Sequence, residues 1–420
     1  MMGFEPTASR ATTWRYNQLS YTHRVVNGKY YIINFLPCQY QKNIFLKKLG
    51  SARKNVVLLR IYLYLYVIIV YVFEKGGGTV KKRHVNIPIF IPHIGCPNAC
   101  VFCNQRSISG HLDFDPASVD KEIAEALATV GDDITCEIAF FGGSFTGIDR
   151  ELMLYLLGVA QKYIDDGRVE GIRMSTRPDY INERVLDDLS RFTVKTVELG
   201  LQSLDDNVLL ASGRGHDAEC AMRACRAIKE AGYELIGQMM IGLPNATPES
   251  ELMTARLICE VGADGARVYP TVVFYDTELA CMTLRGEYTP LTTNAAVERT
   301  KNVLGVFADA DVPCIRVGLQ ASENLADDTK VMGGASHSAI GELAMGELYY
   351  ERICREIERL GISGGDLTVY VSHGSVSKAV GQKKRNKERI CQKYGIRRMK
   401  VLEKSDVLGY NIVLDTSHIK

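Results

Sequence analysis

The sequence predicts an α/β fold, a partial or full parallel (β/α) barrel with a small α+β module at its C-terminal end. Two observations predict this class. Between residues 80 and 285, short runs rich in β-branched residues alternate six times with helical patterns. Such alternation with short connections is typical of a parallel sheet. In addition, polar residues follow the apolar runs abruptly, as expected at the mouth of a barrel.

Six strands and five helices are expected in this barrel region. The strands are 86–91, 137–141, 171–175, 197–200, 235–241 and 265–271. The helices between them are 116–130, 150–166, 181–191, 218–231 and 248–261. The helix at 218–231 shows the clearest period, because Ala221, Ala224, Cys225 and Ile228 recur at three- and four-residue spacing, as on the buried face of a helix.

Residues 286–362 are expected to extend the barrel. Two helices are predicted there, at 293–308 and 343–360. A strand is predicted at 312–317 and a loop at 333–338. Gly364 and Gly365 mark a boundary, because paired glycines interrupt regular structure. The remaining segment, residues 363–420, is predicted to form a small basic module that includes a strand at 367–371.

Residues 1–79 differ in character from the rest of the chain. They carry 11 Lys or Arg against 2 Asp or Glu. We expect a non-native extension from a start codon assigned too early, because residues 74–78 back-translate to a purine tract like a ribosome-binding site and Val80 follows. The alternatives are a membrane anchor over 56–73, interrupted only by Arg60, or part of a genuine N-terminal domain. No membrane partner is expected if the segment is not native.

The charge distribution and the cysteine content further restrict the class of protein. Residues 80–377 hold 27 basic and 43 acidic side chains, a net charge of −16, whereas residues 378–420 hold 12 basic and 4 acidic ones. Twelve cysteines in 420 residues are too few for a disulfide scaffold, and three of them lie within eight residues. This distribution is typical of reduced thiols in a cytoplasmic protein with one group of metal ligands.

The strongest functional signal is the loop after the first strand, where Cys96, Cys100 and Cys103 are spaced C-x3-C-x2-C. Three thiolates on a short loop can hold three irons of a [4Fe-4S] cluster. No fourth cysteine lies nearby, so one iron keeps an open position, as a reactive metal site requires. A zinc site that recruits His93 is the alternative, but the distant second ligand pair of structural zinc sites is missing.

This spacing, with Phe102 before the last cysteine, resembles the signature of the radical S-adenosylmethionine (SAM) superfamily. The resemblance implies a [4Fe-4S] cluster whose free iron binds the amino and carboxylate groups of SAM. It also implies an external electron donor of flavodoxin or ferredoxin type. The electron cleaves SAM to methionine and a 5′-deoxyadenosyl radical, which abstracts hydrogen from a substrate.

Further motifs follow the later strands in a fixed order. They are GGSFT at 142–146, STRPDYI at 175–181, ELGLQS at 198–203, MMIGLPNAT at 239–247 and RVYPTVVFYDTEL at 267–279. Together they resemble the Elongator catalytic-subunit branch of the superfamily, and more narrowly its short bacterial relatives. The resemblance implies that the cofactor contacts Phe102, Gly142, Gly143, Ser144, Arg177, Glu198 and Gln202.

The sequence departs from that family pattern at several points. Ser144 stands where the superfamily usually has Glu, so recognition of the methionine amino group falls to backbone carbonyls and a hydroxyl. The alternative to a cofactor contact of Arg177 is a structural role, in an ion pair with Asp179 or Glu198. The GGASHS loop at 333–338 matches the family's Gly-Pro-x-His-Pro loop only in part, so His337 receives no role.

The C-terminal segment departs from the full Elongator subunit. About 60 residues follow Gly361, too few for its acetyltransferase domain, so acetyl transfer is not expected. Instead, the segment resembles the βα element of KH-type RNA-binding modules, whose G-x-x-G loop clamps nucleotide backbone, although Lys384 replaces the second glycine after Gly381. Phosphate contacts are expected from the basic side chains Lys378, Lys383, Lys384, Arg385 and Lys387. A solvated helical face is the alternative.

The sequence therefore predicts a radical SAM enzyme, with structured RNA, and tRNA in particular, as the favoured substrate class. Two alternatives stay open at this point. One is radical chemistry on a small molecule, with the basic segment serving only solubility. The other is an RNA-binding protein whose cluster is structural or redox-sensing.

Overall fold

The computed structural model describes residues 83–91, 96, 100–103, 114–131, 133–319 and 329–416. All of these residues fall in one compact unit, residues 81–420. The apolar segment 56–73 and His93 lie outside the described residues. Within them, no helix has the length and apolar character needed to cross a membrane.

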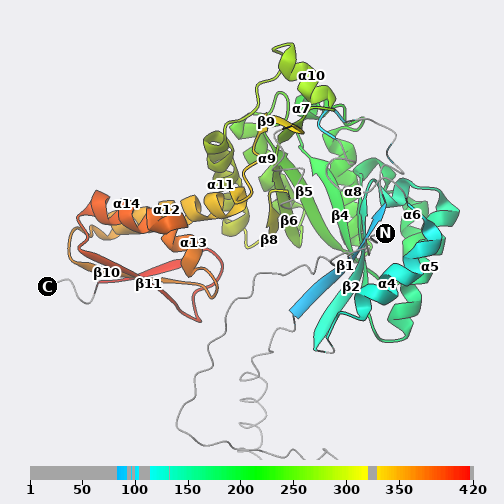
Figure 1. Ribbon diagram of the computed structural model, residues 1–420, viewed down its shortest axis with the longest axis horizontal. Helices are drawn as coiled ribbons and strands as arrows, with labels where there is room; N and C mark the ends of the chain where they lie inside the picture. Colours follow the sequence, from blue (N-terminus) through cyan, green and yellow to red (C-terminus); the bar gives the residue numbers. More distant parts are fainter. Residues whose placement is uncertain are drawn as a thin grey trace, which may run out of the picture. The chain divides into compact units, whose positions relative to one another are not determined.

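A curled sheet of seven parallel strands forms the centre of this unit, in the order β1-β2-β3-β4-β5-β6-β8. The strands are β1 (Arg83–Ile91), β2 (Ile134–Gly142), β3 (Gly171–Thr176), β4 (Val194–Gln202), β5 (Glu234–Ile241), β6 (Gly265–Pro270) and β8 (Cys314–Val317). Among the described strands, β1 and β8 form the two edges (Figure 1). The predicted parallel barrel is thus confirmed as a half-barrel.

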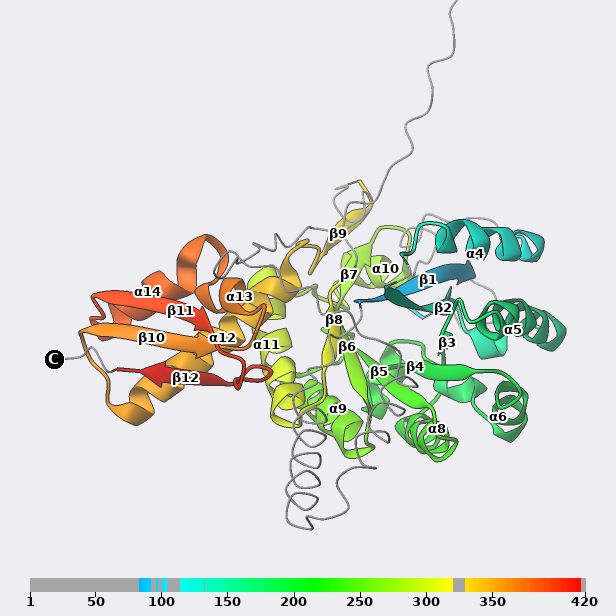
Figure 2. The ribbon, with the colours of Figure 1, turned by 90° about the horizontal axis from the view of Figure 1, so that it is seen from below.

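Helices alternate with the strands and cover the outer face of the sheet (Figure 2). They are α4 (Val119–Leu127), α5 (Arg150–Asp165), α6 (Glu183–Leu189), α8 (Ala218–Glu230) and α9 (Pro248–Glu260). Each of the last four begins after a capping residue whose side-chain oxygen accepts a backbone N–H of the first turn: Asp149, Asn182, Asp217 and Thr247. Such caps satisfy helix donors that have no partner within the helix.

Alternation along the strands places the apolar core between sheet and helices. Outward-facing strand residues such as Ile138 and Ile172 are fully buried against helix residues such as Leu156 and Ile228. This packing buries the apolar stripe of each helix, which is the main source of its stability. It leaves the inner face of the sheet to carry polar side chains.

The six strands and five helices predicted between 86 and 271 are all present, with ends displaced by at most three residues. Several short elements were missed: α7 (Asp206–Ala211), α10 (Glu278–Leu284) and the antiparallel pair β7 (Val272–Phe274) and β9 (Val331–Gly334). Elements of three to seven residues are too short to show a period. The 3-10 turns η1 (Pro116–Ser118), η2 (Phe145–Gly147) and η3 (Pro178–Tyr180) are short as well.

The barrel continues into α11 (Thr293–Asp309) and α12 (Ile340–Leu360), and then into a small mixed sheet. That sheet has the order β11-β10-β12, in which β10 pairs parallel with β11 and antiparallel with β12. Its elements are β10 (Asp366–Val371), α13 (Val376–Val380), η5 (Gln382–Lys384), α14 (Arg385–Tyr394), β11 (Arg398–Glu403) and β12 (Ile412–Asp415). The predicted α+β module is therefore present.

Helix α12 belongs to two cores at once. Its first half, with Ile340, Ala344 and Leu348, packs in a cluster with residues of α11. Its second half packs with the C-terminal sheet, where Tyr349 and Ile353 are fully buried. The C-terminal module, expected to begin at residue 363, thus completes its core with residues that precede that boundary.

We predict that a chain beginning at Val80 folds like the full chain, because the described cores lie within the unit 81–420. Its thermal midpoint should lie within about 2 °C of that of the full chain. Calorimetry of both proteins checks this. Insoluble truncated protein, or peptides from residues 1–79 in the mass spectrum of protein isolated from its source, would contradict the interpretation of this segment as a non-native extension.

Candidate functional site

The cysteine loop follows the end of β1 and is held from two sides. The Val101 N–H donates to the carbonyl of Ser212, just after α7, at 3.1 Å. The Val101 carbonyl accepts from the N–H of Leu279, in α10, at 2.8 Å. Phe102 packs beside it against the apolar cluster that contains Leu279 and Ala280. Elements that the sequence did not predict thus fix the loop.

Side chains from neighbouring segments lie close to the sulfurs of Cys96 and Cys100. The Ser144 Oγ, after β2, lies 3.6 Å from Cys96 Sγ. Arg177, after β3, places its Nη1 3.8 Å from Cys100 Sγ, and Arg214, between α7 and α8, places its Nη1 3.3 Å from the same sulfur. Because the strands are parallel, the segments that follow them meet at one edge of the sheet.

The donor set consists of three cysteine thiols, the ligands that hold iron–sulfur clusters. Within the described residues, no three His, Cys, Asp or Glu side chains surround a point where one metal ion could bind. A cubane cluster does not require this, because each of its cysteines binds a different iron. Cys96, Cys100 and Cys103 therefore suit a [4Fe-4S] cluster, with hydroxyl and guanidinium groups next to the sulfurs, as in the outer shell of metal sites.

Gly142 is required by the contact between β1 and β2. Its φ is +119°, and a Cβ added there would lie 2.3 Å from the carbonyl oxygen of Ile91. The next residue, Gly143, donates its N–H to that same oxygen at 3.0 Å. The sequence related both glycines to close approach of a ligand. The structure shows a reason within the chain for the first of them.

Arg177 is buried and its charge is paired. Its guanidinium donates two bonds of 2.9 Å to Asp179 and one to the carbonyl of Arg214. Burial, the largest single cause, lowers the pKa of Arg177, but the hydrogen bond and the charge of Asp179, together with the nearby Cys100 and Cys96, raise this pKa above its ordinary value. The Arg177–Asp179 ion pair that the sequence offered as an alternative is therefore present, in addition to the contact with Cys100.

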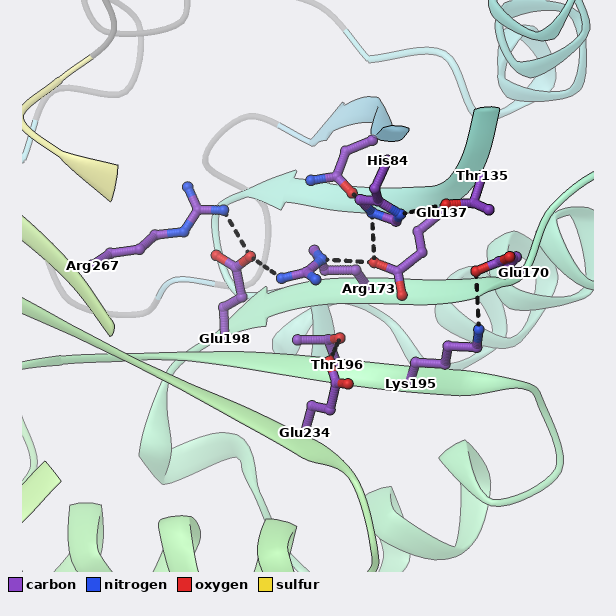
Figure 3. Close-up of polar contacts among 11 residues, drawn as sticks. His84, Thr135, Glu137, Glu170, Arg173, Lys195, Thr196, Glu198, Glu234 and Arg267 are labelled. Carbon is purple, nitrogen blue, oxygen red and sulfur yellow. Dashed lines mark hydrogen bonds and ion pairs between the residues drawn. The ribbon is translucent and has the colours of Figure 1, made fainter. Parts of the chain in front are cut away.

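Glu198 belongs to a row of ion pairs across the sheet (Figure 3). Its Oε1 accepts from Arg173 at 3.0 Å and from Arg267 at 2.8 Å. Arg173 also donates to Glu137 at 3.0 Å, and His84 Nε2 lies 3.4 Å from the same carboxylate. The five side chains come from β1, β2, β3, β4 and β6. Two carboxylates and two guanidinium groups thus balance one another.

Gln202 also contacts another side chain of the sheet. Its Oε1 accepts from Gln238 Nε2 at 3.0 Å, next to an irregularity in the pairing of β4 with β5. The structure therefore brings Ser144 and Arg177 beside the cysteines, whereas Glu198 and Gln202 engage other residues. His337, which received no role, accepts the N–H of Ala339 at 3.1 Å before α12.

Sequence reasoning missed Arg214. It lies between Gly213 and Gly215, both with positive φ, in the turn that leads into α8. A charged residue between two glycines, just before the predicted helix 218–231, was the signal that could have revealed it. The nearby His216 is neutral at neutral pH, because burial and then the charge of Arg214 lower its pKa to about 4.

The eight basic residues between Lys378 and Arg397 divide into two groups. Arg389, Lys393 and Arg397 form ion pairs, with Glu347, Glu358 and Asp366 respectively. The other five form no ion pair with any described residue: Lys378 on α13, Lys383 and Lys384 in η5, and Arg385 and Lys387 on α14. These five are the ones for which the sequence predicted phosphate contacts.

A half-barrel of parallel strands with a three-cysteine loop after its first strand defines a cluster-binding enzyme that uses SAM. Comparison with known families agrees. Residues 90–258 match the Radical SAM superfamily, and residues 263–350 match the Radical_SAM C-terminal domain. The chain belongs to the radical SAM superfamily, whose enzymes use a [4Fe-4S] cluster and SAM and need a reductant.

Three curated relatives illustrate its place in that superfamily. Elongator complex protein 3 of Saccharomyces cerevisiae is 27% identical over 66% of this chain and 53% of its own length. Protein YhcC of Escherichia coli is 28% identical over 46% and 66%. The tRNA uridine(34) acetyltransferase of Methanocaldococcus jannaschii is 28% identical over 44% and 38%. The chain thus spans less than two thirds of the length of each relative.

We predict that Gly142→Ala lowers the free energy of unfolding by about 3–4 kcal/mol, since a methyl group would meet the Ile91 carbonyl and the residue keeps a positive φ. Gly167→Ala is the matched control: φ is +72°, but no atom lies within 4 Å of the added Cβ. The Gly167→Ala control should lower the free energy of unfolding by about 1–2 kcal/mol. Urea denaturation of both variants measures the difference, and equal costs would contradict the close approach.

Proposed function

We propose that this radical SAM enzyme acts on RNA, with tRNA as the favoured substrate. The observation that carries the proposal is the group of five unpaired basic side chains on α13, η5 and α14 of the C-terminal module. The names of the relatives support it, since one of them is a tRNA uridine(34) acetyltransferase. Acetyl transfer is not part of the proposal.

The cysteine loop supplies the reactive centre. In this proposal Cys96, Cys100 and Cys103 hold the cluster, and Gly142, Gly143, Ser144 and Arg177 contribute to the binding of SAM beside it. When bound, the cluster and SAM supply a radical that abstracts hydrogen from the substrate. Ser144 is fully buried, so its hydroxyl is shielded from water and held next to Cys96. Arg177 is fixed by Asp179 and cannot swing away from Cys100.

All seven expected cofactor contacts stay predictions. Among them, Phe102 packs in an apolar cluster, and Glu198 and Gln202 bind other side chains. The flavodoxin- or ferredoxin-type electron donor also stays a prediction. A ligand that reached Glu198 would have to compete with the guanidinium groups of Arg173 and Arg267.

Charge distribution explains why the module is needed for an RNA substrate. Residues 80–377 carry a net charge of −16, which repels a polyanion. Positive side chains that are not neutralised within the chain remain available to phosphates. Lys383, Lys384 and Arg385 are consecutive and exposed, so they form the centre of such a surface.

The turn that carries these residues is anchored to the rest of the unit. Lys384 donates its N–H to the carbonyl of Gly381 at 3.0 Å, and both Lys383 and Lys384 have positive φ. Asn386 is buried and donates to the carbonyl of Gly346, in α12, at 2.7 Å. The turn therefore presents its side chains from a fixed backbone, which reduces the entropy lost on binding.

We predict that changing Cys96, Cys100 and Cys103 to Ala abolishes the oxygen-sensitive cluster and the reductive cleavage of SAM by dithionite. Iron and sulfide analysis after anaerobic reconstitution, with assay of 5′-deoxyadenosine, measures both. Cys220→Ala is the control, because Cys220 lies on α8 with exposure similar to that of Cys96 and should leave the iron content unchanged. Stoichiometric zinc without iron in the wild-type protein would exclude the cluster.

We also predict that RNA affinity falls with salt, with a slope of log affinity against log salt of roughly −2 to −5, if three to five side chains reach phosphates. Replacing Lys383, Lys384 and Arg385 with Ala should flatten this slope by about two to three units. Cluster content and SAM cleavage without RNA should not change. Filter binding of bulk tRNA at several salt concentrations measures the slope.

A matched triple variant controls for net charge. The control changes three exposed residues on the barrel helices α4, α5 and α6: Lys121, Lys162 and Arg184. Changing them to Ala removes three positive charges, as many as the variant in the C-terminal module loses. This variant should keep the wild-type slope. Equal slopes in both triple variants, or no RNA binding at low salt, would instead favour a small-molecule substrate and a C-terminal module that is only a solvated surface.

A further inference from the structure

Two buried arginines converge on one sulfur of the cysteine loop. Arg177 and Arg214 are each 4% exposed, and Cys100 is 7% exposed. The Nη1 atoms of the two guanidinium groups lie 3.8 Å and 3.3 Å from Cys100 Sγ. The groups are also linked, because Arg177 donates to the backbone carbonyl of Arg214. A pair of buried cations is costly unless negative charge lies nearby.

The described contacts hold both guanidinium groups in place. Arg177 shares two hydrogen bonds with the carboxylate of Asp179. Arg214 uses Nη2 to donate to the carbonyl of Gly200, while Nη1 faces the Cys100 sulfur. The Arg214 carbonyl also lies 3.4 Å from Nδ1 of His216. Each guanidinium group thus places one N–H donor at the Cys100 sulfur, and the donor of Arg214 lies at the shorter distance.

We propose that Arg214, supported by Arg177, is a positioning residue that raises the reduction potential of the cluster bound at Cys100. The proposal rests on the proposed cluster site and extends it to the control of electron entry. On reduction, one electron passes from the reductant to the cluster, which becomes more negative by one unit while no bond breaks. Positive charge and N–H donors at a ligand sulfur stabilise that reduced state more than the oxidised one.

This role matters for an enzyme that must be reduced before it can cleave SAM. Ser144, which lies 3.6 Å from Cys96 Sγ, offers a neutral hydroxyl, whereas the described contacts of Cys100 are with charged donors. Burial strengthens the effect, since little water screens the guanidinium groups from the sulfur.

The test measures the midpoint potential of the cluster in the full chain, without SAM. Anaerobically reconstituted protein is titrated with dithionite, and the reduced cluster is followed by electron paramagnetic resonance. Arg214→Gln should shift the equilibrium of one-electron reduction at least tenfold toward the oxidised cluster, which corresponds to a potential lower by 59 mV or more. Arg214→Lys keeps the positive charge, so it should restore most of the difference in midpoint potential between Arg214→Gln and the wild-type protein. Arg389→Gln, a half-buried arginine that pairs with Glu347, should leave the potential unchanged.

The outcomes separate this inference from the proposed function. A wild-type protein that assembles no cluster would refute the proposed function itself. A cluster with wild-type iron content and an unchanged potential in Arg214→Gln would overturn only the inference. If that variant holds no cluster, Arg177→Gln decides: a lower potential supports the role of the arginine pair, and the wild-type potential refutes it.

Discussion

The parallel pairing of β1 with β2 determines where the reactive groups lie. Nine residue pairs run from Arg83 and Ile134 to Ile91 and Gly142, so the two strands end at the same level. The cysteine loop leaves β1 there, and the segment with Ser144 leaves β2 beside it. This close approach of backbones has no space for a Cβ at Gly142. The distance between Ser144 and Cys96 is thus a consequence of strand register.

The two faces of the half-barrel have different chemistry because side chains alternate along each strand. The outer face is apolar and packs on the helices, whereas the inner face carries Glu137, Arg173, Glu198 and Arg267. These charges neutralise one another in pairs, which limits the cost of their burial. By contrast, Arg214 faces a cysteine sulfur and carbonyl oxygens. The described contacts thus place Arg173 and Arg267 in the row of ion pairs inside the barrel, and Arg177 and Arg214 at the cysteine loop.

Much of this fold could be predicted from the sequence, because long elements show a period and caps mark their ends. Helix α8 was found through Ala221, Ala224, Cys225 and Ile228, all of which are buried. The cysteines were found through spacing alone. Contacts between distant segments, such as that of Arg214 with Cys100, leave no local pattern. For the same reason the sequence alone did not reveal the ion-pair partners of Glu198, because Arg173 and Arg267 come from other strands.

Helix α12 gives the C-terminal module an unusual dependence on what precedes it. Its 21 residues span about 31 Å at the rise of an α-helix, and its two halves are buried in different cores. There is accordingly no linker at which the module could be exchanged during evolution. A gene fusion or deletion cut at residue 362 would leave Tyr349, Ile353 and Ile357 without their neighbours. Recombination between relatives preserves both cores only if α12 stays together with α11 and with the segment that follows it.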